Sequence, residues 1–277
     1  MKRNTWIKWI IVYSVLILFL VAALFPVYWM ANTSFKFQKE IYNPAPTFWP
    51  HVFTLSGYKE VLFDKGFLNN IKNSLIVSCT VTLISAVVSY IAAYAIVKLD
   101  FPGRKFSSKA VLYAYLLPRT VLYIPLYLFI SKIGLSDTLL GLILIYPIFT
   151  IPYATWMLIA YLKSIPEGLE ESAEIDGCSK LQSMVRIALP LSLPGVMSTV
   201  IFMFTMCWSE YLYALVVIQE SAKKTITLAL SNMMIGDIFA WGPLMAGSII
   251  CTLPVLLMYV LSSRYLVTGT TMGAVKG

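Results

Sequence analysis

The longest uncharged stretch of the chain constrains its fold most strongly. No Asp, Glu, Lys or Arg occurs from Trp9 to Phe35. About 20 apolar residues in a helix suffice to cross the hydrocarbon core of a bilayer. The stretch is also longer than the roughly 7–15 apolar residues of a cleaved signal peptide. We therefore predict a retained membrane-spanning helix near the N-terminus.

Composition extends this interpretation to the whole chain of 277 residues. Hydrophobic residues make up 59% and charged residues only 12%, whereas soluble domains carry about 25% charged residues. An all-α integral membrane protein with six transmembrane helices follows, organised as a single transmembrane domain over residues 1–277. The predicted spans are 10–31, 73–97, 110–130, 138–162, 191–217 and 243–263.

The distribution of Lys and Arg predicts the orientation. With a cytoplasmic N-terminus, twelve cationic residues fall inside and eight outside, in the direction of the positive-inside rule. The short loop KLDFPGRKFSSK at 98–109 contributes most clearly to this bias. Six spans then place both termini in the cytoplasm. The net charge of +8 is explained by residues flanking the spans, so no nucleic-acid partner is expected.

An acidic segment interrupts the apolar sequence at residues 163–190. Its first part, SIPE at 164–167, has the pattern of a capping box, and SKLQ at 179–182 repeats that pattern. Gly177 is suited to end a helix in the left-handed conformation. We therefore predict a short helix over 165–176, a glycine turn, and a second helix that leads to Pro190.

The first of these helices is predicted to carry a carboxylate stripe. At 100° per residue, four glutamates lie within an arc of about 100°, beside an apolar patch of Leu169 and Ala173. Two interpretations follow: a solvated loop helix, or an element that docks its apolar patch and acids against a basic partner. The glutamates are Glu167, Glu170, Glu171 and Glu174.

The acidic segment also carries a motif, E-S-A-x-x-x-G-x(9)-I-x-L-P. It resembles the E-A-A-x-x-x-G-x(9)-I-x-L-P signature of binding-protein-dependent ABC importer permeases. The one departure is Ser172 where alanine is usual, a small-for-small exchange. The matching residues are Glu171, Ser172, Ala173, Gly177, Ile187, Leu189 and Pro190.

Other segments resemble the carbohydrate branch of the same family. The stretch from Pro118 to Leu144 is similar to the region that precedes the signature in carbohydrate permeases. WSEYLYAL, from Trp208, resembles their W-N-E-F/Y-L-x-x-L segment, and GAVKG at 273–277 resembles the tail of the smaller maltose-type permease subunit.

This resemblance implies a type I ABC importer permease architecture. The loop at 163–190 would be a cytoplasmic coupling-helix loop that sits in a cleft of an ATP-binding subunit. The membrane bundle would alternate between inward-facing and outward-facing states. The residues implied in coupling to the ATPase are Glu170, Glu171, Ser172, Ala173, Asp176 and Gly177.

The resemblance also implies partners. The sequence lacks a G-x-x-x-x-G-K-[ST] phosphate loop, so ATP and Mg would be used by two partner ATP-binding cassette subunits. A second, different permease, an extracellular solute-binding protein and the lipid bilayer of a bacterial plasma membrane complete the expected assembly. The chain itself is not expected to be an enzyme, to bind a cofactor or to hold a metal, since its four cysteines are scattered and His51 is its only histidine.

The substrate pathway is predicted from ionisable and aromatic residues in the spans. Ionisable residues in a membrane usually face the interior of the bundle, and aromatic rings can stack on sugars. Glu210 is alternatively a structural hydrogen-bonding residue near the outer surface, and the resemblance leaves open that the partner permease alone holds the sugar. The candidates are Tyr115, Arg119, Tyr123, Trp208, Glu210 and Tyr211.

Two other classes of protein remain open at this stage. An ion-coupled secondary transporter would need carboxylates at the membrane midplane, for which only Glu210 is available. An intramembrane enzyme would need a group of catalytic residues that the sequence does not offer. Within the importer class, oligosaccharides of several lengths and glycerol phosphate all remain possible substrates.

Overall fold

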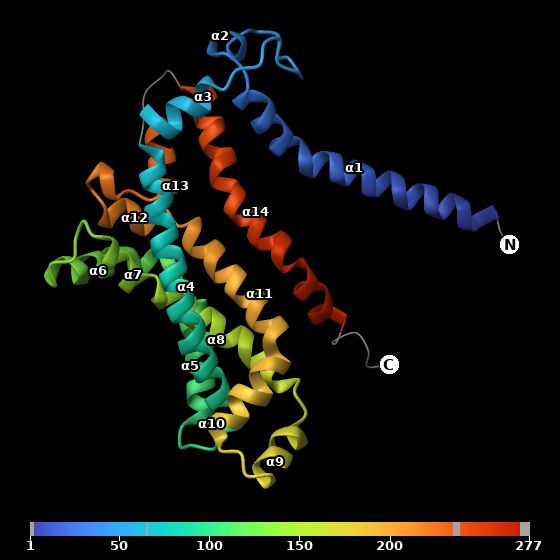
Figure 1. Cartoon of the computed structure of the whole chain (residues 1–277), viewed down its shortest axis with the longest axis vertical. Helices are drawn as coiled ribbons and strands as arrows, with labels where there is room; N and C mark the ends of the chain where they lie inside the picture. Colours follow the sequence, from blue (N-terminus) through green and yellow to red (C-terminus); the bar gives the residue numbers. More distant parts are fainter. Residues whose placement is uncertain (1–2, 65, 235–238, 272–277) are drawn as a thin grey trace. The chain divides into compact units, whose positions relative to one another are not determined.

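In the computed structural model, all regular secondary structure of the described residues is helical (Figure 1). The structure describes residues 3–64, 66–234 and 239–271, and side chains of residues 6–63, 66–166, 168–234 and 239–261. The chain divides into two compact units, Met1–Leu68 with Leu230–Leu253, and Asn69–Ala229 with Pro254–Gly277. The expected single transmembrane domain over residues 1–277 stays a prediction.

The first unit joins the N-terminal helix to the beginning of the last one. The side chains of Gln38 and Tyr42 both donate to the Phe239 carbonyl, at 2.9 and 2.7 Å. Gly57 packs so close to the backbone of Gly242 that a Cβ would lie 2.9 Å from it. The helices are α1 (Arg3–Ser34), α2 (Gln38–Ile41), α3 (Ser56–Lys59), η1 (Glu60–Asp64), η4 (Asn232–Met234) and the first half of α14 (Trp241–Thr271).

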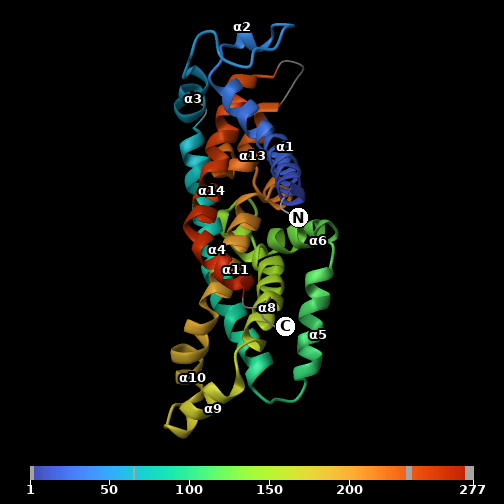
Figure 2. The ribbon, with the colours of Figure 1, turned by 90° about the vertical axis from the view of Figure 1, so that its right-hand side faces the viewer.

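The second unit contains the remaining helices. In both views α9 and α10 lie at one end of this unit, and α6 lies well away from them (Figures 1 and 2). Helix α8 packs against α5 and α11. The helices are α4 (Phe67–Lys98), α5 (Arg104–Leu116), α6 (Arg119–Lys132), α7 (Leu139–Ile145), α8 (Pro147–Lys163), α9 (Glu167–Ile175), α10 (Lys180–Ser183), η2 (Met184–Ala188), α11 (Leu189–Trp208), α12 (Leu212–Val217), η3 (Ser221–Lys223) and α13 (Ile226–Ser231).

The described residues include five helical segments long and apolar enough to cross a membrane, and a sixth if one bent pair counts as a span. Four of the predicted spans coincide with such helical segments, with small shifts at their ends. The chain is therefore a multi-pass membrane protein. The four segments are Trp6–Ser34, Phe67–Lys98, Leu139–Lys163 and Trp241–Leu261.

The third predicted span, 110–130, is not one straight helix. It consists of α5 and α6, which meet at an angle of 94°. Proline lacks the N–H that a helix needs, and it restricts the preceding residue to extended conformations. Leu117 and Pro118 both have extended backbone angles, so Pro118 explains the bend.

The fifth predicted span, 191–217, extends past the end of its helix, and the apolar helical segment that contains its first part begins earlier, at Lys180. Helix α11 ends at Trp208, and a separate helix α12 begins at Leu212. The cause is Glu210, whose carboxylate accepts hydrogen bonds from the backbone N–H groups of Tyr213 and Ala214 at 2.9 and 3.1 Å. These bonds satisfy the first turn of α12 and start a new helix.

The interior of the second unit consists of two hydrophobic clusters. One joins α4, α7, α8 and α12 around the fully buried Tyr146 and Leu142. The other joins the C-terminal parts of α4 and α8 around Tyr94, Leu158 and Leu162. The second cluster lies next to the segment with the sequence signature, because Ile165 and Ala188 belong to it.

Asp137 ties two loops together at the α6–α7 connection. Its Oδ1 accepts from the backbone N–H groups of Gln219 and Glu220 at 2.9 and 3.0 Å, and its Oδ2 pairs with Lys223 at 3.1 Å. Asp137 itself has a φ of 57°, a left-handed conformation that aspartate tolerates better than most residues. The backbone hydrogen bonds from Glu220 and Gln219, with Lys223, lower the pKa of the Asp137 carboxyl.

We predict that Gly195→Ala destabilises the protein by about 1–3 kcal/mol, the usual cost of overpacking. A Cβ at this position would lie 2.3 Å from the Tyr161 ring, so α8 and α11 would have to separate. Thermal unfolding in detergent measures the effect. Gly168→Ala is the matched control, because its Cβ would meet open space and the protein should be as stable as before or more so. Equal unfolding temperatures for the two variants would contradict this packing.

We predict that Asp137→Asn lowers the unfolding temperature at neutral pH. The decrease should become smaller in acid. Because the folded pKa lies below the unfolded value of about 3.9, the carboxylate stabilises the fold fully above that value. The stabilisation is lost as the pH falls from there through the folded pKa. The difference in unfolding temperature between the native protein and the variant should therefore narrow in acid. A difference that is constant with pH would disprove the stabilising role of the Asp137 carboxylate.

Candidate functional site

The signature segment forms two short helices joined at Gly177. Helix α9 ends with the N–H of Cys178 bonded to the Ala173 carbonyl at 2.9 Å, and the N–H of Gly177 bonded to Glu174 at 3.0 Å. This is the Schellman pattern, which requires a left-handed residue after the cap. Gly177 has a φ of +92°, which confirms the prediction for this glycine.

The two predicted capping boxes have different outcomes. Ser179 and Gln182 form the second one, with both reciprocal hydrogen bonds present. The first one, at 164–167, is wrong. Ser164 ends α8 and donates its hydroxyl to the Tyr161 carbonyl at 2.7 Å, and Pro166 precedes α9 without a side-chain cap. Ser164 is therefore used by the preceding helix, which the local sequence pattern does not reveal.

Glu170 points into the protein instead of outwards. It is only 6% exposed. Its Oε1 lies 3.5 Å from the Lys98 ammonium, and its Oε2 accepts from the Tyr94 hydroxyl at 3.4 Å. Lys98 is buried to the same degree as Glu170, so the ion pair is shielded from water. Removing one partner of such a pair costs far more than removing a surface ion pair.

Three residues on one face of α4 contact the segment between Ile165 and Met184. Tyr90, Tyr94 and Lys98 are spaced four residues apart, so they lie along one side of the helix. Besides the contacts to Glu170, Lys98 reaches the Ile165 carbonyl, and Tyr94 and Tyr90 reach the carbonyls of Lys180 and Met184, each at 3.5 Å. Sequence reasoning missed these three residues, although their spacing at the end of an apolar helix was a visible signal.

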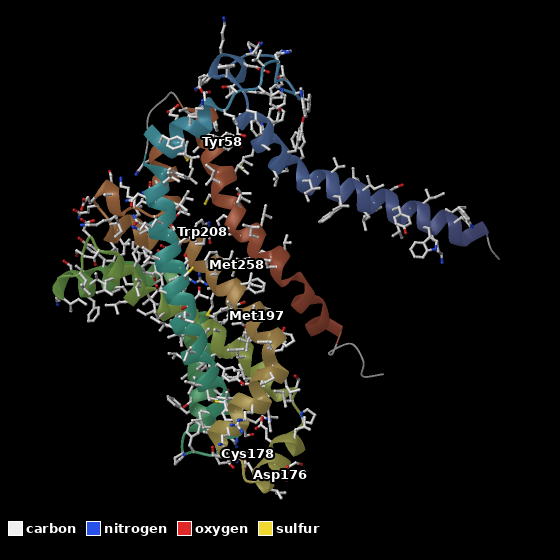
Figure 3. The ribbon with its side chains drawn as sticks, viewed as in Figure 1. Tyr58, Asp176, Cys178, Met197, Trp208 and Met258 are labelled. Carbon is white, nitrogen blue, oxygen red and sulfur yellow. The ribbon has the colours of Figure 1, made fainter. Side chains whose placement is uncertain are left out.

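The outward surface of α9 differs from the predicted carboxylate stripe. Glu170 is buried, Glu174 pairs with Lys180, and the side chain of Glu167 lies outside the described residues. The predicted apolar patch of Leu169 and Ala173 is exposed only at Leu169, because Ala173 is buried. Figure 3 places Asp176 and Cys178 at the tip of the segment. We call the exposed residues the α9 face: Leu169, Glu171, Ser172, Ile175, Asp176 and Gly177.

The α9 face combines apolar and acidic groups. Ile175 is 86% exposed, and Leu181 on α10 is exposed as well. Large apolar side chains that gather at the surface commonly mark a site of protein interaction. Ser172 donates its hydroxyl to the Gly168 carbonyl of its own helix at 2.7 Å, so it replaces alanine without disturbing a packed contact.

Glu210 is a structural residue. Besides starting α12, its carboxylate accepts from the Tyr146 hydroxyl at 2.8 Å, and its carbonyl accepts from Thr227 at 2.6 Å. These hydrogen bonds agree with the alternative assignment of Glu210 as a structural hydrogen-bonding residue, and its place near the outer surface stays a prediction. In the part of the chain that the structure describes, no ion pair joins Glu210 to Arg119.

Arg119 is the exposed charge at the bend between α5 and α6. Its guanidinium lies 4.9 Å from the centre of the Phe149 ring and 3.9 Å from the Met206 sulfur. Its carbonyl accepts from the Tyr213 hydroxyl at 2.9 Å. Tyr213 thus connects Arg119 with Glu210, while the guanidinium keeps an open side.

The aromatic candidates do not form one patch. Tyr115 stacks on Trp156 at 5.5 Å across α5 and α8. Tyr123 and Tyr211 are half-buried against the cluster around Tyr146. Trp208 is only 2% exposed and stacks on Phe204; Figure 3 marks its position on α11. Of the six candidates, Arg119 is exposed, Trp208 is buried, and the other four are half-buried.

The geometry suits a mechanical role. Among the described residues no three potential metal-ligating side chains converge. The GAVKG segment at 273–277, which resembles the tail of the smaller maltose-type permease subunit, lies outside the described residues. The signature segment is held to α4 by buried contacts on one side, and it exposes apolar and acidic residues on the other.

Comparisons with known proteins agree with the sequence signature. Residues 70–270 match the model of a family described as "Binding-protein-dependent transport system inner membrane component". The chain is 34% identical to the inner membrane ABC transporter permease protein YcjP of Escherichia coli, over 96% of this chain and 95% of that protein.

Two further relatives are named as permeases of sugar transport systems. The chain is 35% identical to the trehalose/maltose transport system permease protein MalG of Thermococcus litoralis, over 94% of each chain. It is 33% identical to the diacetylchitobiose uptake system permease protein DasC of Streptomyces coelicolor, over 93% of each chain.

A solved structure confirms the fold. A chain of a bacterial ABC transporter involved in the import of the acidic polysaccharide alginate superimposes with a TM-score of 0.82, over 95% of this chain and 98% of that one, at 20% identity. The family model covers most of the chain, and relatives above 30% identity span nearly all of it. The chain therefore belongs to the family of inner membrane components of binding-protein-dependent transport systems.

Proposed function

We propose that this chain is the permease subunit of an ATP-driven importer of sugars, and that the α9 face is its joint to an ATPase. The observation that carries the proposal is the folded signature. Its exposed apolar and acidic surface is fixed to the spans through the buried pair of Lys98 and Glu170. A force applied to α9 therefore moves α4 directly.

The six residues predicted to couple to the ATPase divide into two groups. Glu171, Ser172, Asp176 and Gly177 are exposed and are available to a partner. Glu170 and Ala173 are buried and hold α9 against the bundle. In this proposal the first group contacts the ATPase, and the second group transmits its movement.

The energy source and the other partners follow from the same role. Without a phosphate loop of its own, the chain needs two ATP-binding subunits, which use ATP and Mg. A second, different permease completes the pathway, and an extracellular solute-binding protein delivers the substrate. Residues 163–190 and both termini would then face the cytoplasm of a bacterium, with the chain in the plasma membrane.

The substrate class is proposed from the relatives and from the pathway. The names of two relatives specify trehalose or maltose and diacetylchitobiose, which favours an oligosaccharide. Tyr115 and Arg119 are the proposed contacts on this chain, because an aromatic face and a multidentate donor suit a polyhydroxylated solute. Ion-coupled transport is less well supported, since the Glu210 carboxylate is already occupied by three hydrogen bonds.

We predict that Glu171→Lys and Gly177→Val each abolish ATP-driven uptake by the complete transporter. The first reverses a charge on the α9 face, and the second places a β-branched residue at a positive φ. Insertion into the membrane should be unchanged. Uptake into proteoliposomes, ATPase rate and subunit stoichiometry measure the effect.

Ser172→Ala is the matched control for these variants. It restores the usual residue of the signature and removes only a hydroxyl bonded within α9, so uptake should continue at the native rate. Normal uptake by Gly177→Val or Glu171→Lys, with the ATPase bound at native stoichiometry, would refute the proposed joint.

We predict that Glu170→Gln acts differently, by destabilising the chain itself. It leaves Lys98 buried without its partner, at a cost of roughly 3 kcal/mol. The unfolding temperature of the isolated subunit in detergent should fall, whereas Glu171→Lys should leave it unchanged. The double variant Lys98→Glu/Glu170→Lys should recover part of the loss. Equal unfolding temperatures for Glu170→Gln and the native chain would contradict the anchoring role.

A further inference from the structure

A basic pocket lies where α4, α5 and α8 come together, apart from the α9 face. Its volume is about 1010 Å³. Three lysines line it together with Phe101 and Phe106. We call it the lysine pocket, after Lys105, Lys109 and Lys163.

The three lysines keep their charge free for a ligand. Asp100 is the only acidic residue that lines the pocket, and it pairs with Arg104 at 2.8 Å. Arg104 also donates to the Ile96 and Val97 carbonyls at the end of α4, so it is a structural part of the loop. In the described part of the chain no ion pair involves any of the three lysines.

The pocket lies at the level where the spans end. Helix α4 ends at Lys98, α5 begins at Arg104, and α8 ends at Lys163. Lys98 and Lys163 end two of the candidate spans, and Arg104 begins the bent pair of α5 and α6. Residues at span ends lie at the depth of the lipid headgroups, because the hydrocarbon core ends there.

The apolar groups of the pocket distinguish a lipid from a dissolved anion. Phe106 is 76% exposed and stands on α5 between Lys105 and Lys109 in sequence. A phenylalanine beside lysines is poorly placed for binding a fully hydrated ion. It is well placed for a molecule that has both a phosphate and an acyl chain.

We infer that the lysine pocket binds the phosphate headgroup of an anionic phospholipid. The lysine ammonium groups would contact the phosphodiester, and Phe106 would pack against the upper part of an acyl chain. Basic pockets between transmembrane helices on the cytoplasmic side bind such headgroups. The inference rests on the proposed orientation, which places residues 98–109 on the cytoplasmic side, and the site is separate from the proposed sugar pathway.

The test uses the complete transporter in nanodiscs of phosphatidylcholine. A photoactivatable phosphatidylglycerol is added, and labelled peptides are identified by mass spectrometry. Labelling is expected within residues 98–109, and a photoactivatable phosphatidylcholine should label them at least tenfold less. Each lysine near an anionic headgroup contributes roughly fivefold in affinity. The triple variant Lys105→Gln/Lys109→Gln/Lys163→Gln should therefore reduce phosphatidylglycerol labelling by on the order of 100-fold.

Two controls separate the site from general charge effects and from misfolding. Lys72→Gln/Lys132→Gln removes two exposed lysines that do not line the pocket. In this variant, phosphatidylglycerol should label residues 98–109 as strongly as in the native protein. The triple change of the pocket lysines to Arg keeps the charge and should retain labelling. Equal labelling by the two lipids, native labelling of the triple Gln variant, or displacement of the lipid by inorganic phosphate would each overturn the inference.

Discussion

The buried pair of Lys98 and Glu170 connects the two parts of the molecule that its proposed role requires. One partner ends the second span, and the other stands in the middle of α9. A charged pair withdrawn from water holds only if both partners stay in place, and Tyr94 adds a hydrogen bond to the same carboxylate. Helix α9 has nine residues, too few to be a stable helix alone. Its fixed position is therefore supplied by α4, and its exposed face is free for another protein.

The opposite part of the second unit is fixed by similar means. Glu210 starts α12 and holds Tyr146, while Asp137 joins the α6–α7 loop to the segment after α12. Pro118 turns α6 away from α5 by 94°, and this bend leaves Arg119 at an exposed corner. In this unit, hydrogen bonds of polar side chains thus connect helices with loops, and the apolar clusters fill the space between the helices. Within this unit, hydrogen bonds and apolar packing therefore connect the helices and loops to one another.

Most of the fold could be predicted from hydropathy, because each span must be long and apolar. The turn at Gly177 and the cap at Ser179 were also predictable, since both depend on residues close in sequence. The burial of Glu170 was not, because its partner Lys98 is 72 residues away and a helical stripe of glutamates does not show which member turns inwards. The split at Glu210 was missed because a carboxylate in an apolar stretch can start a helix as well as line a pathway. The bend of 94° at Pro118 was not predicted, because the angle between α5 and α6 depends on packing that the sequence does not show.

In the proposed assembly the α9 face contacts an ATPase at the cytoplasmic surface. A single cysteine placed at Ile175, in a chain whose four native cysteines are replaced by serine, tests this contact most directly in the complete transporter. The account predicts that a membrane-impermeant thiol reagent labels this cysteine in inverted vesicles but not in intact cells. It also predicts that a short thiol-to-amine cross-linker joins the cysteine to an ATP-binding subunit. Labelling from outside the cell, or a cross-link to no nucleotide-hydrolysing subunit, would contradict the account.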